Sequence, residues 1–314
     1  LVRVEDGSGA VVWEEGRVSA TPASVTLRAH YRARDLVALP GFLGGTMHGA
    51  LGHALHALGG SDLLDSRPVP DAAPGFVRAG AAPPCVMVPP ALGMARELAP
   101  GAPLELAVLL VEPDAARIGV LLAALETMGR RGLGRGRGRL ELVRVEDGSG
   151  AVVWEEGRVA ASPAPDVAAR ATGPGPWTVR ATTPLHLVRG GELLTSPGAA
   201  DVVVAAARRL VTLAWTHGRE VACDVREVEH RARAALPDTT GRWERVRGER
   251  WSERQRRLHP VEGVVGALAL GAAFEPYLPL LGHALRFGIG KGTALGLGRL
   301  ELVLGDASPA SGPP

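Results

Sequence analysis

The chain has 314 residues, 46% of them hydrophobic and 22% charged, which is typical of a globular protein with one large core or two ordinary ones. Lys291 is the only lysine, so the net charge of +2 is carried by arginine, and so small a charge does not by itself indicate a nucleic-acid partner. Cys85 and Cys223 fit no metal or redox spacing, and the longest apolar run is too short to span a bilayer, so we expect buried thiols in a cytoplasmic protein.

The first 18 residues (LVRVEDGSGAVVWEEGRV) recur letter for letter at residues 142–159. Each copy predicts a β-hairpin, with a GSG turn between two strands. Nothing else in the chain matches itself so well, and the chain does not begin with Met. We therefore expect residues 1–24 to be an artefact of cloning or sequence assignment, not a genuine duplication.

The first half then follows a clear order of elements. Residues 25–34 (VTLRAHYRAR) alternate apolar and polar, as a half-buried strand does. A Pro/Gly turn over 39–45 precedes a predicted helix from about 47 to 58, and residues 115–127 have helical periodicity. Residues 128–142 (MGRRGLGRGRGRLEL) then form the first glycine loop, which runs into a strand.

The second half repeats this order. Residues 177–187 (WTVRATTPLHL) predict a strand, residues 199–216 a long helix, and residues 275–287 another helix. The second glycine loop, residues 288–302 (GIGKGTALGLGRLEL), follows at a constant offset of 160 residues from the first.

A βαββαβ order that occurs twice predicts an α+β protein with tandem ferredoxin-like (RRM-like) domains, each ending in a glycine-rich loop and a strand. We expect an N-terminal domain over residues 25–159 and a C-terminal domain over residues 177–304. An Ala/Pro-rich linker at 160–176 joins them, and residues 305–314 form a flexible tail.

Five segments in order resemble the CRISPR-associated repeat-processing endoribonucleases of the RAMP superfamily. The closest resemblance lies in FGIGKGTALGLGRLEL (residues 287–302), which looks like the C-terminal glycine loop of that family. The other four are GFLGGTMHGALGHAL (41–55), TPLHLVRGGELL (183–194), WSERQ (251–255) and VEGVVGALAL (261–270). The similarity covers most of residues 25–304.

The resemblance implies an enzyme that binds precursor CRISPR RNA and cuts it within its repeats without a metal or other cofactor. The ribose 2′-hydroxyl would attack the scissile phosphate, leaving a 2′,3′-cyclic phosphate and a 5′-hydroxyl. The implied partners are CRISPR repeat RNA (pre-crRNA and crRNA) and other Cas proteins of an effector complex. The alternative from the same scaffold is a non-catalytic RAMP subunit that holds crRNA, and a third reading is an unrelated ferredoxin-like regulator.

Such a reaction needs a base, an acid and positive charge, and histidine suits the proton transfers. In many relatives a histidine in or near the first helix serves, and here the helix at 47–58 holds His48, His53 and His56. We favour His48, at the open start of the helix and on the side of Leu51, Leu55 and Leu58, which should face the core, although relatives often carry arginine at this position. His53 and His56 are expected to share a different, more exposed face. The further catalytic candidates are His53 and Tyr31; packing is the stronger explanation for Tyr31, and it remains open that none of them is catalytic.

The candidate RNA-binding residues lie in both glycine loops and in an arginine-rich segment with Trp243 and Trp251. Glycine lets the backbone approach a phosphate, and arginine and aromatic side chains bind phosphates and bases. The alternative is that the glycines only permit a tight passage from helix to strand and that the arginines are solvated. The candidates are Arg130, Arg131, Arg135, Arg137 and Arg139; Gly288, Gly290, Lys291, Gly292, Gly296, Gly298 and Arg299; and Arg254, Arg256 and Arg257.

Overall fold

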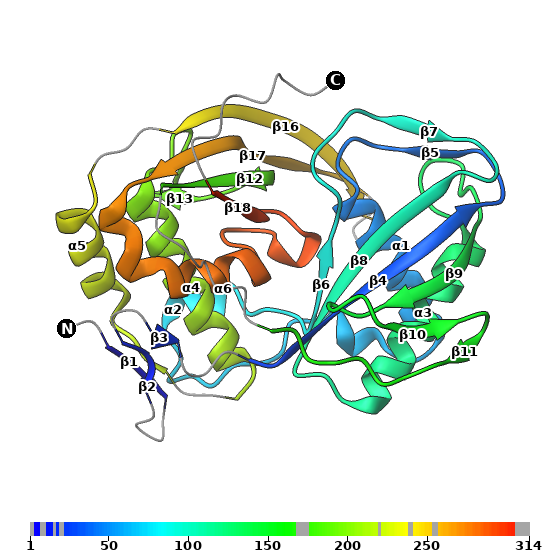
Figure 1. The fold of residues 1–314 in the computed structure, drawn as a ribbon, viewed down its shortest axis with the longest axis horizontal. Helices are drawn as coiled ribbons and strands as arrows, with labels where there is room; N and C mark the ends of the chain where they lie inside the picture. The colour runs from blue at the N-terminus through cyan, green and yellow to red at the C-terminus, as the bar shows by residue number, and fades with distance from the viewer. Residues whose placement is uncertain are drawn as a thin grey trace.

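The computed structural model describes residues 3–6, 11–14, 17–18, 22–167, 176–218, 221–237, 241–252 and 257–304. Two lobes lie side by side, each built on one antiparallel sheet with helices packed against it (Figure 1). We call the elements from β4 to β11 the N lobe and those from β12 to β18 the C lobe.

The N lobe has a six-stranded sheet in the order β11-β10-β9-β4-β8-β6. Its four strands β9-β4-β8-β6 have the strand order of a ferredoxin-like domain, and α1 packs against α3. The predicted alternation in β4 is confirmed, because Val25, Leu27, Ala29 and Tyr31 are buried. The elements are β4 (Ser24–Ala33), β5 (Val37–Leu39), α1 (Gly44–Ala57), η1 (Ser61–Leu63), α2 (Gly75–Ala79), β6 (Cys85–Val88), β7 (Arg96–Leu98), β8 (Pro103–Val111), α3 (Ala115–Arg131), β9 (Leu140–Glu146), β10 (Val152–Glu155) and β11 (Arg158–Val159).

The C lobe has a four-stranded sheet in the order β16-β17-β12-β18, which is the same ferredoxin-like order. Its β16 and β17 form a long hairpin that arches toward the N lobe (Figure 1). The elements are β12 (Trp177–Leu185), β13 (Val188–Arg189), β14 (Glu192–Leu193), α4 (Ala199–Thr216), β15 (Val221–Ala222), α5 (Val225–Ala235), β16 (Arg242–Ser252), β17 (Arg257–Leu270), η2 (Ala272–Tyr277), α6 (Leu278–Phe287), η3 (Thr293–Leu295) and β18 (Leu300–Leu304).

The tandem ferredoxin-like fold predicted from the sequence is therefore confirmed, with differences at the helix ends. Helix α1 begins at Gly44, three residues before the predicted start. The helix predicted over 275–287 is divided into η2 and α6, with Pro276 inside the 3-10 segment and a proline in the first turn of α6. The prediction that Leu58 faces the core is wrong, because the side chain is 42% exposed just beyond the end of α1.

The two identical 18-residue segments lie in different places. The copy at 142–159 forms β9 to β11 at the edge of the N lobe sheet, where Val145, Val153 and Trp154 are buried. The first copy forms β1 (Arg3–Asp6), β2 (Val11–Glu14) and β3 (Arg17–Val18), and β1 pairs with β15 of the C lobe. Both copies thus form the predicted antiparallel strands, in two different sheets.

The lobes share a small apolar core. Val86 and Leu109 of the N lobe are buried in one cluster with Leu213 of α4 and Phe287 of α6. Cys85, next to Val86 on β6, is buried, and Cys223 is half-buried; both are free thiols, and burial raises the pKa of each to about 12. None of the helices in the described ranges is long and apolar enough to cross a membrane.

Candidate active site

Helix α1 begins at the boundary between the lobes, where two glycines let it approach the C lobe closely. A Cβ added at Gly44 would lie 1.8 Å from the backbone oxygen of Leu295, in the second glycine loop. A Cβ added at Gly45 would lie 3.1 Å from the Cβ of Arg250, near the end of β16. The sequence Gly44-Gly45 therefore sets the start of α1 directly against two segments that lie far away in the chain.

His48 lies one turn further along α1, three and four residues after these glycines, and so shares their side of the helix. Its side chain is half-buried. The first-turn N–H groups of a helix have no intrahelical partner, and the helix dipole favours an anion at this end. The fold thus brings together an imidazole, a helix N-terminus, the second glycine loop and the Arg250 side chain.

Arg250 is half-buried, and desolvation lowers the pKa of its guanidinium. A positive charge in a partly dry position acts more strongly on a neighbouring anion than one in bulk water. Directly opposite Arg250 in the β16–β17 hairpin stands His259. Desolvation and the charges of Arg257 and Arg250 lower the pKa of His259, which favours its neutral form.

Arg250 and His259 were not among the site residues predicted from the sequence. Arg250 lies in the arginine-rich segment that holds Trp243 and Trp251, and His259 follows that segment. The cross-strand register of the hairpin was the signal that could have joined them, since it pairs the two residues face to face.

The second glycine loop is a tightly bonded scaffold. Gly288, Gly290, Gly292, Gly296 and Gly298 all have positive φ values, between 68° and 85°. The N–H groups of Ile289, Lys291 and Gly298 donate to the carbonyls of Gly298, His186 and Pro184 at 3.0 Å. These three donors are already used within the C lobe, whereas the Lys291 side chain is exposed and available to an anion.

Gly296 shows that the same loop also joins the two lobes. A Cβ added there would lie 2.1 Å from Cδ of Pro89, just after β6 of the N lobe. At this position glycine allows close packing between the lobes, a role that neither RNA contact nor the predicted tight passage from helix to strand describes. Arg299 ends the loop: its N–H donates to Oγ1 of Thr183 at 2.9 Å and its Nη1 donates to the carbonyl of Arg286 at 2.6 Å.

The first glycine loop packs within its own lobe. The N–H of Leu133 donates to the carbonyl of Gly138 at 2.9 Å, and a Cβ at Gly134 would lie 2.0 Å from the carbonyl oxygen of Ala38. Arg139 forms a two-point ion pair with Asp35, at 2.8 and 3.1 Å, which lowers the pKa of that carboxyl group.

The other arginines of the first loop differ in their partners. Arg130 pairs with Glu126 at 3.4 Å, and Arg131 donates to the carbonyl of His53 at 3.4 Å. Arg135 and Arg137 are exposed, and neither guanidinium has a hydrogen bond or ion pair with any residue in the described ranges. Of the five predicted arginines, these two are the ones presented to solvent without a partner in that part of the chain.

Tyr31 and His53 lie away from the lobe boundary. Tyr31 is 2% exposed, its hydroxyl donates to the carbonyl of Leu125 at 2.9 Å, and burial raises its pKa. This arrangement fits the packing explanation for Tyr31. His53 is exposed as predicted, but it is five residues after His48, which turns it about 140° around the helix. Its carbonyl meets the end of α3, so the structure does not bring His53 and His48 together.

The third predicted cluster is only partly described. Arg254 and Arg256, with most of the WSERQ segment, lie outside the described residues. Arg257 is exposed, and its Nε lies 3.4 Å from Nε2 of His259. Nε1 of Trp243 donates to the carbonyl of Pro197 at 3.0 Å, so this ring is fixed against its own lobe. Within the described part of the chain, no three His, Cys, Asp or Glu side chains group closely enough to hold a metal ion.

Comparison with known proteins connects this geometry to a family. Residues 179–300 match the family model of the CRISPR-associated endoribonuclease Cas6, and residues 63–166 match a second model described as an N-terminal domain. The resemblance predicted from the sequence is thereby confirmed. No curated protein matches this sequence.

Solved structures share the fold at low sequence identity. A chain of the partial Cas6-RT-Cas1–Cas2 complex is 12% identical, with a TM-score of 0.58, over 92% of this chain and 47% of its own length. A product complex of Thermus thermophilus Cas6 is 17% identical, with a TM-score of 0.50, over 90% of this chain and 100% of its own. The chain thus spans about half of the first structure's polypeptide and all of the second's.

Proposed function

We propose that this chain, whose residues 179–300 match the Cas6 endoribonuclease family, binds precursor CRISPR RNA and cuts it within its repeats without a metal ion. The observation that carries the proposal is the junction of the His48 turn of α1 with Arg250 and the second glycine loop. The other predicted catalytic histidine, His53, lies about 140° away around the helix.

The junction supplies the groups that the reaction needs. His48 and His259 serve as the acid and base: one takes the proton of the 2′-hydroxyl, whose oxygen attacks phosphorus. The other protonates the departing 5′ oxygen as its bond to phosphorus breaks. Arg250, Lys291 and the N-terminus of α1 stabilise the negative charge on the phosphorane. The products are a 2′,3′-cyclic phosphate and a 5′-hydroxyl.

RNA further from the cut would be held by the exposed arginines at the tip of the first glycine loop, Arg135 and Arg137, and by Arg257 beside His259. Arginine side chains bind phosphates and release counterions, which provides affinity for any sequence. Other Cas proteins are proposed as partners, since one structural neighbour is described as a complex with RT-Cas1 and Cas2.

One observation favours a second candidate, a non-catalytic subunit that holds crRNA. Of the three catalytic residues predicted from the sequence, only His48 lies at the junction, while Tyr31 is buried and His53 faces elsewhere. Such a subunit would use the same arginines and loops but would not cut.

Cleavage of a labelled repeat RNA in EDTA separates the two candidates. We expect cutting by the wild type, none of a substrate with a 2′-deoxy sugar at the cut, and a fall of at least about 100-fold in His48→Ala. His56→Ala is the matched control, because His56 is an exposed histidine on the same helix, and it should cut normally. Tight RNA binding without cleavage by the wild type would contradict the nuclease proposal and favour the crRNA-holding subunit.

A further inference from the structure

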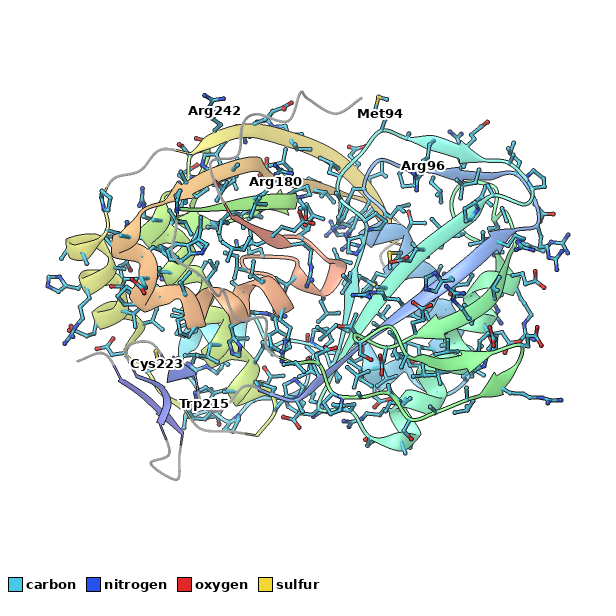
Figure 2. All side chains as sticks on the ribbon, in the orientation of Figure 1. Met94, Arg96, Arg180, Trp215, Cys223 and Arg242 are labelled. Atoms are coloured by element: carbon cyan, nitrogen blue, oxygen red, sulfur yellow. The ribbon has the colours of Figure 1, made fainter. Side chains whose placement is uncertain are left out.

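A cavity of about 500 Å³ lies where the two lobes meet, apart from the His48 junction. Its N lobe wall carries Thr26 and Arg28 of β4 and Arg96 of β7, and its C lobe wall carries Arg299 at the end of the second glycine loop. Figure 2 shows Arg96 on β7, at the end of the N lobe nearest the β16–β17 hairpin. His48, Arg250 and Lys291 do not line this cavity.

The lining is positively charged. The lining residues include three arginines and one carboxylate, that of Glu105, so the net charge of the lining is +2. Glu105 itself lies 3.8 Å from Nδ1 of His30. Arg28 and Arg96 form no ion pair or hydrogen bond through their guanidinium groups with any side chain in the described ranges. A doubly negative anion would match this charge.

More positive charge lies behind the wall formed by Arg299. Arg209 of α4 is 8% exposed and donates to the carbonyl of Phe287 at 3.5 Å, but its Nε is buried without a partner among the residues described. Nη2 of Arg286 is likewise buried without a partner in that part of the chain. Burial and the charge of Arg299 lower the pKa of Arg209 to about 10, and burial lowers that of Arg299 to about 10.

Two carboxylates offset part of this charge: Glu301 acts to raise the pKa of Arg299, and Asp166 acts on Arg286. Asp166 is near enough to raise the pKa of Arg286, but its oxygens already accept from the hydroxyls of Ser24 and Thr26 and from the N–H of Thr26. Uncompensated buried charge is costly, and an anion in the adjoining cavity reduces that cost. The layer therefore strengthens the electrostatic attraction of the cavity for anions.

We propose that this cavity binds a phosphoryl group, as inorganic phosphate or as a mononucleotide, with Arg28, Arg96 and Arg299 as its ligands. Arginine forks match phosphate oxygens two at a time. The volume falls within the range of small-molecule sites, roughly 300–1,000 Å³. Because the ligands come from both lobes, the bound anion holds the lobes together and stabilises the folded chain by mass action. The site acts independently of the proposed RNA cleavage.

Thermal unfolding and calorimetry on the whole chain, in chloride buffer at constant ionic strength, test the site. The probes are inorganic phosphate, AMP and adenosine. We expect phosphate or AMP to raise the unfolding temperature saturably, and adenosine, which lacks the phosphoryl group, to leave it unchanged. Arg28→Gln and Arg96→Gln should each weaken binding at least tenfold. Arg32→Gln is the matched control, since Arg32 is an exposed arginine further along the same face of β4 and does not line the cavity.

The proposal is overturned if phosphate and AMP act no differently from added chloride, or if Arg28→Gln and Arg32→Gln weaken binding equally. Occupation of the cavity by RNA alone, with neither small molecule binding, would also overturn it. Phosphate binding by the wild type together with RNA cleavage at the normal rate by Arg28→Gln would support a separate site. Failure of phosphate binding leaves the His48 cleavage experiment untouched, so the two proposals fail separately.

Discussion

The two glycine loops share a motif at an offset of 160 residues, yet their environments are opposite. Gly136 of the first loop has nothing within 4 Å of an added Cβ, whereas its counterpart Gly296 meets Pro89 of the other lobe. Arg139 is exposed and paired with Asp35, whereas its counterpart Arg299 is largely buried and donates to a backbone carbonyl. One motif thus serves a solvent-facing loop in the N lobe and a joint between lobes in the C lobe.

This difference indicates that the motif itself determines only the connection from helix to strand. Both loops need positive φ at several glycines and both return directly into the last strand of a ferredoxin-like sheet. What each loop contacts depends on the packing of the lobes, which places the second loop against α1 and β6 and leaves the tip of the first in solvent.

The matched pair Gly296→Ala and Gly136→Ala gives the largest expected effect. Both positions have φ near +80° to +90°, so both substitutions bring backbone strain of about 1 kcal/mol. Only Gly296→Ala also forces a contact with Pro89, which should raise the total destabilisation to about 3 kcal/mol. Denaturant unfolding of both variants measures the difference, and equal losses would mean that the second loop does not join the lobes.

How much of this could be predicted from the sequence follows from the same comparison. The fold could be predicted, because the periodicity of the strands and helices is a local feature of the sequence. The repeated order of helix, glycine loop and strand is local as well. The buried face of β4, and with it the packing of Tyr31, also followed from alternation. The approach of Gly44 to Leu295 could not, since two residues about 250 positions apart become neighbours only after the lobes dock.

The candidate site was predictable to the same extent. His48 was placed at the open end of its helix because helix periodicity is local, and the structure keeps it on the side that faces the second glycine loop. Arg250 and His259 required the register of a hairpin, and the different partners of the five arginines in the first loop required tertiary contacts. Neither can be read from spacing alone.

A second contrast lies in the helices that lead into the loops. At the offset of 160 residues, Ala123 of α3 corresponds to His283 of α6. His283 is 5% exposed, and burial with the nearby charges of Arg286 and Arg209 lowers its pKa to about 3. In the unfolded chain a histidine titrates near 6.5. Above that pH the imidazole is mostly neutral in both states, so the lowered pKa costs no folding stability. As the pH falls from about 6.5 toward 3, the unfolded state takes up a proton that the folded state resists, and stability is lost.

We therefore expect His283→Leu to reduce the acid sensitivity of the chain. Between pH 7 and pH 5 the wild type should lose about 2 kcal/mol of unfolding free energy more than the variant does. His230→Gln, at an exposed histidine of α5 in the same lobe, is the control and should follow the wild type. Urea unfolding at the two pH values measures this; parallel losses in all three proteins would mean that His283 is not held neutral by burial.

The smallest expected effect concerns how the solvent-facing loop binds RNA. Arg135 and Arg137 at its tip have no partner in the described part of the chain, so both are available to phosphates, whereas Arg130 and Arg139 are already paired with Glu126 and Asp35. The double variant Arg135→Gln/Arg137→Gln should reduce the slope of log affinity against log salt by about 1 to 2, because each phosphate contact releases counterions. The equally charged control Arg130→Gln/Arg139→Gln should keep a slope close to that of the wild type.

Titration of a repeat RNA from low to moderate salt gives the slopes. Equal reductions in both variants would show that RNA displaces the ion pairs of this loop, and that its paired and unpaired arginines bind RNA alike.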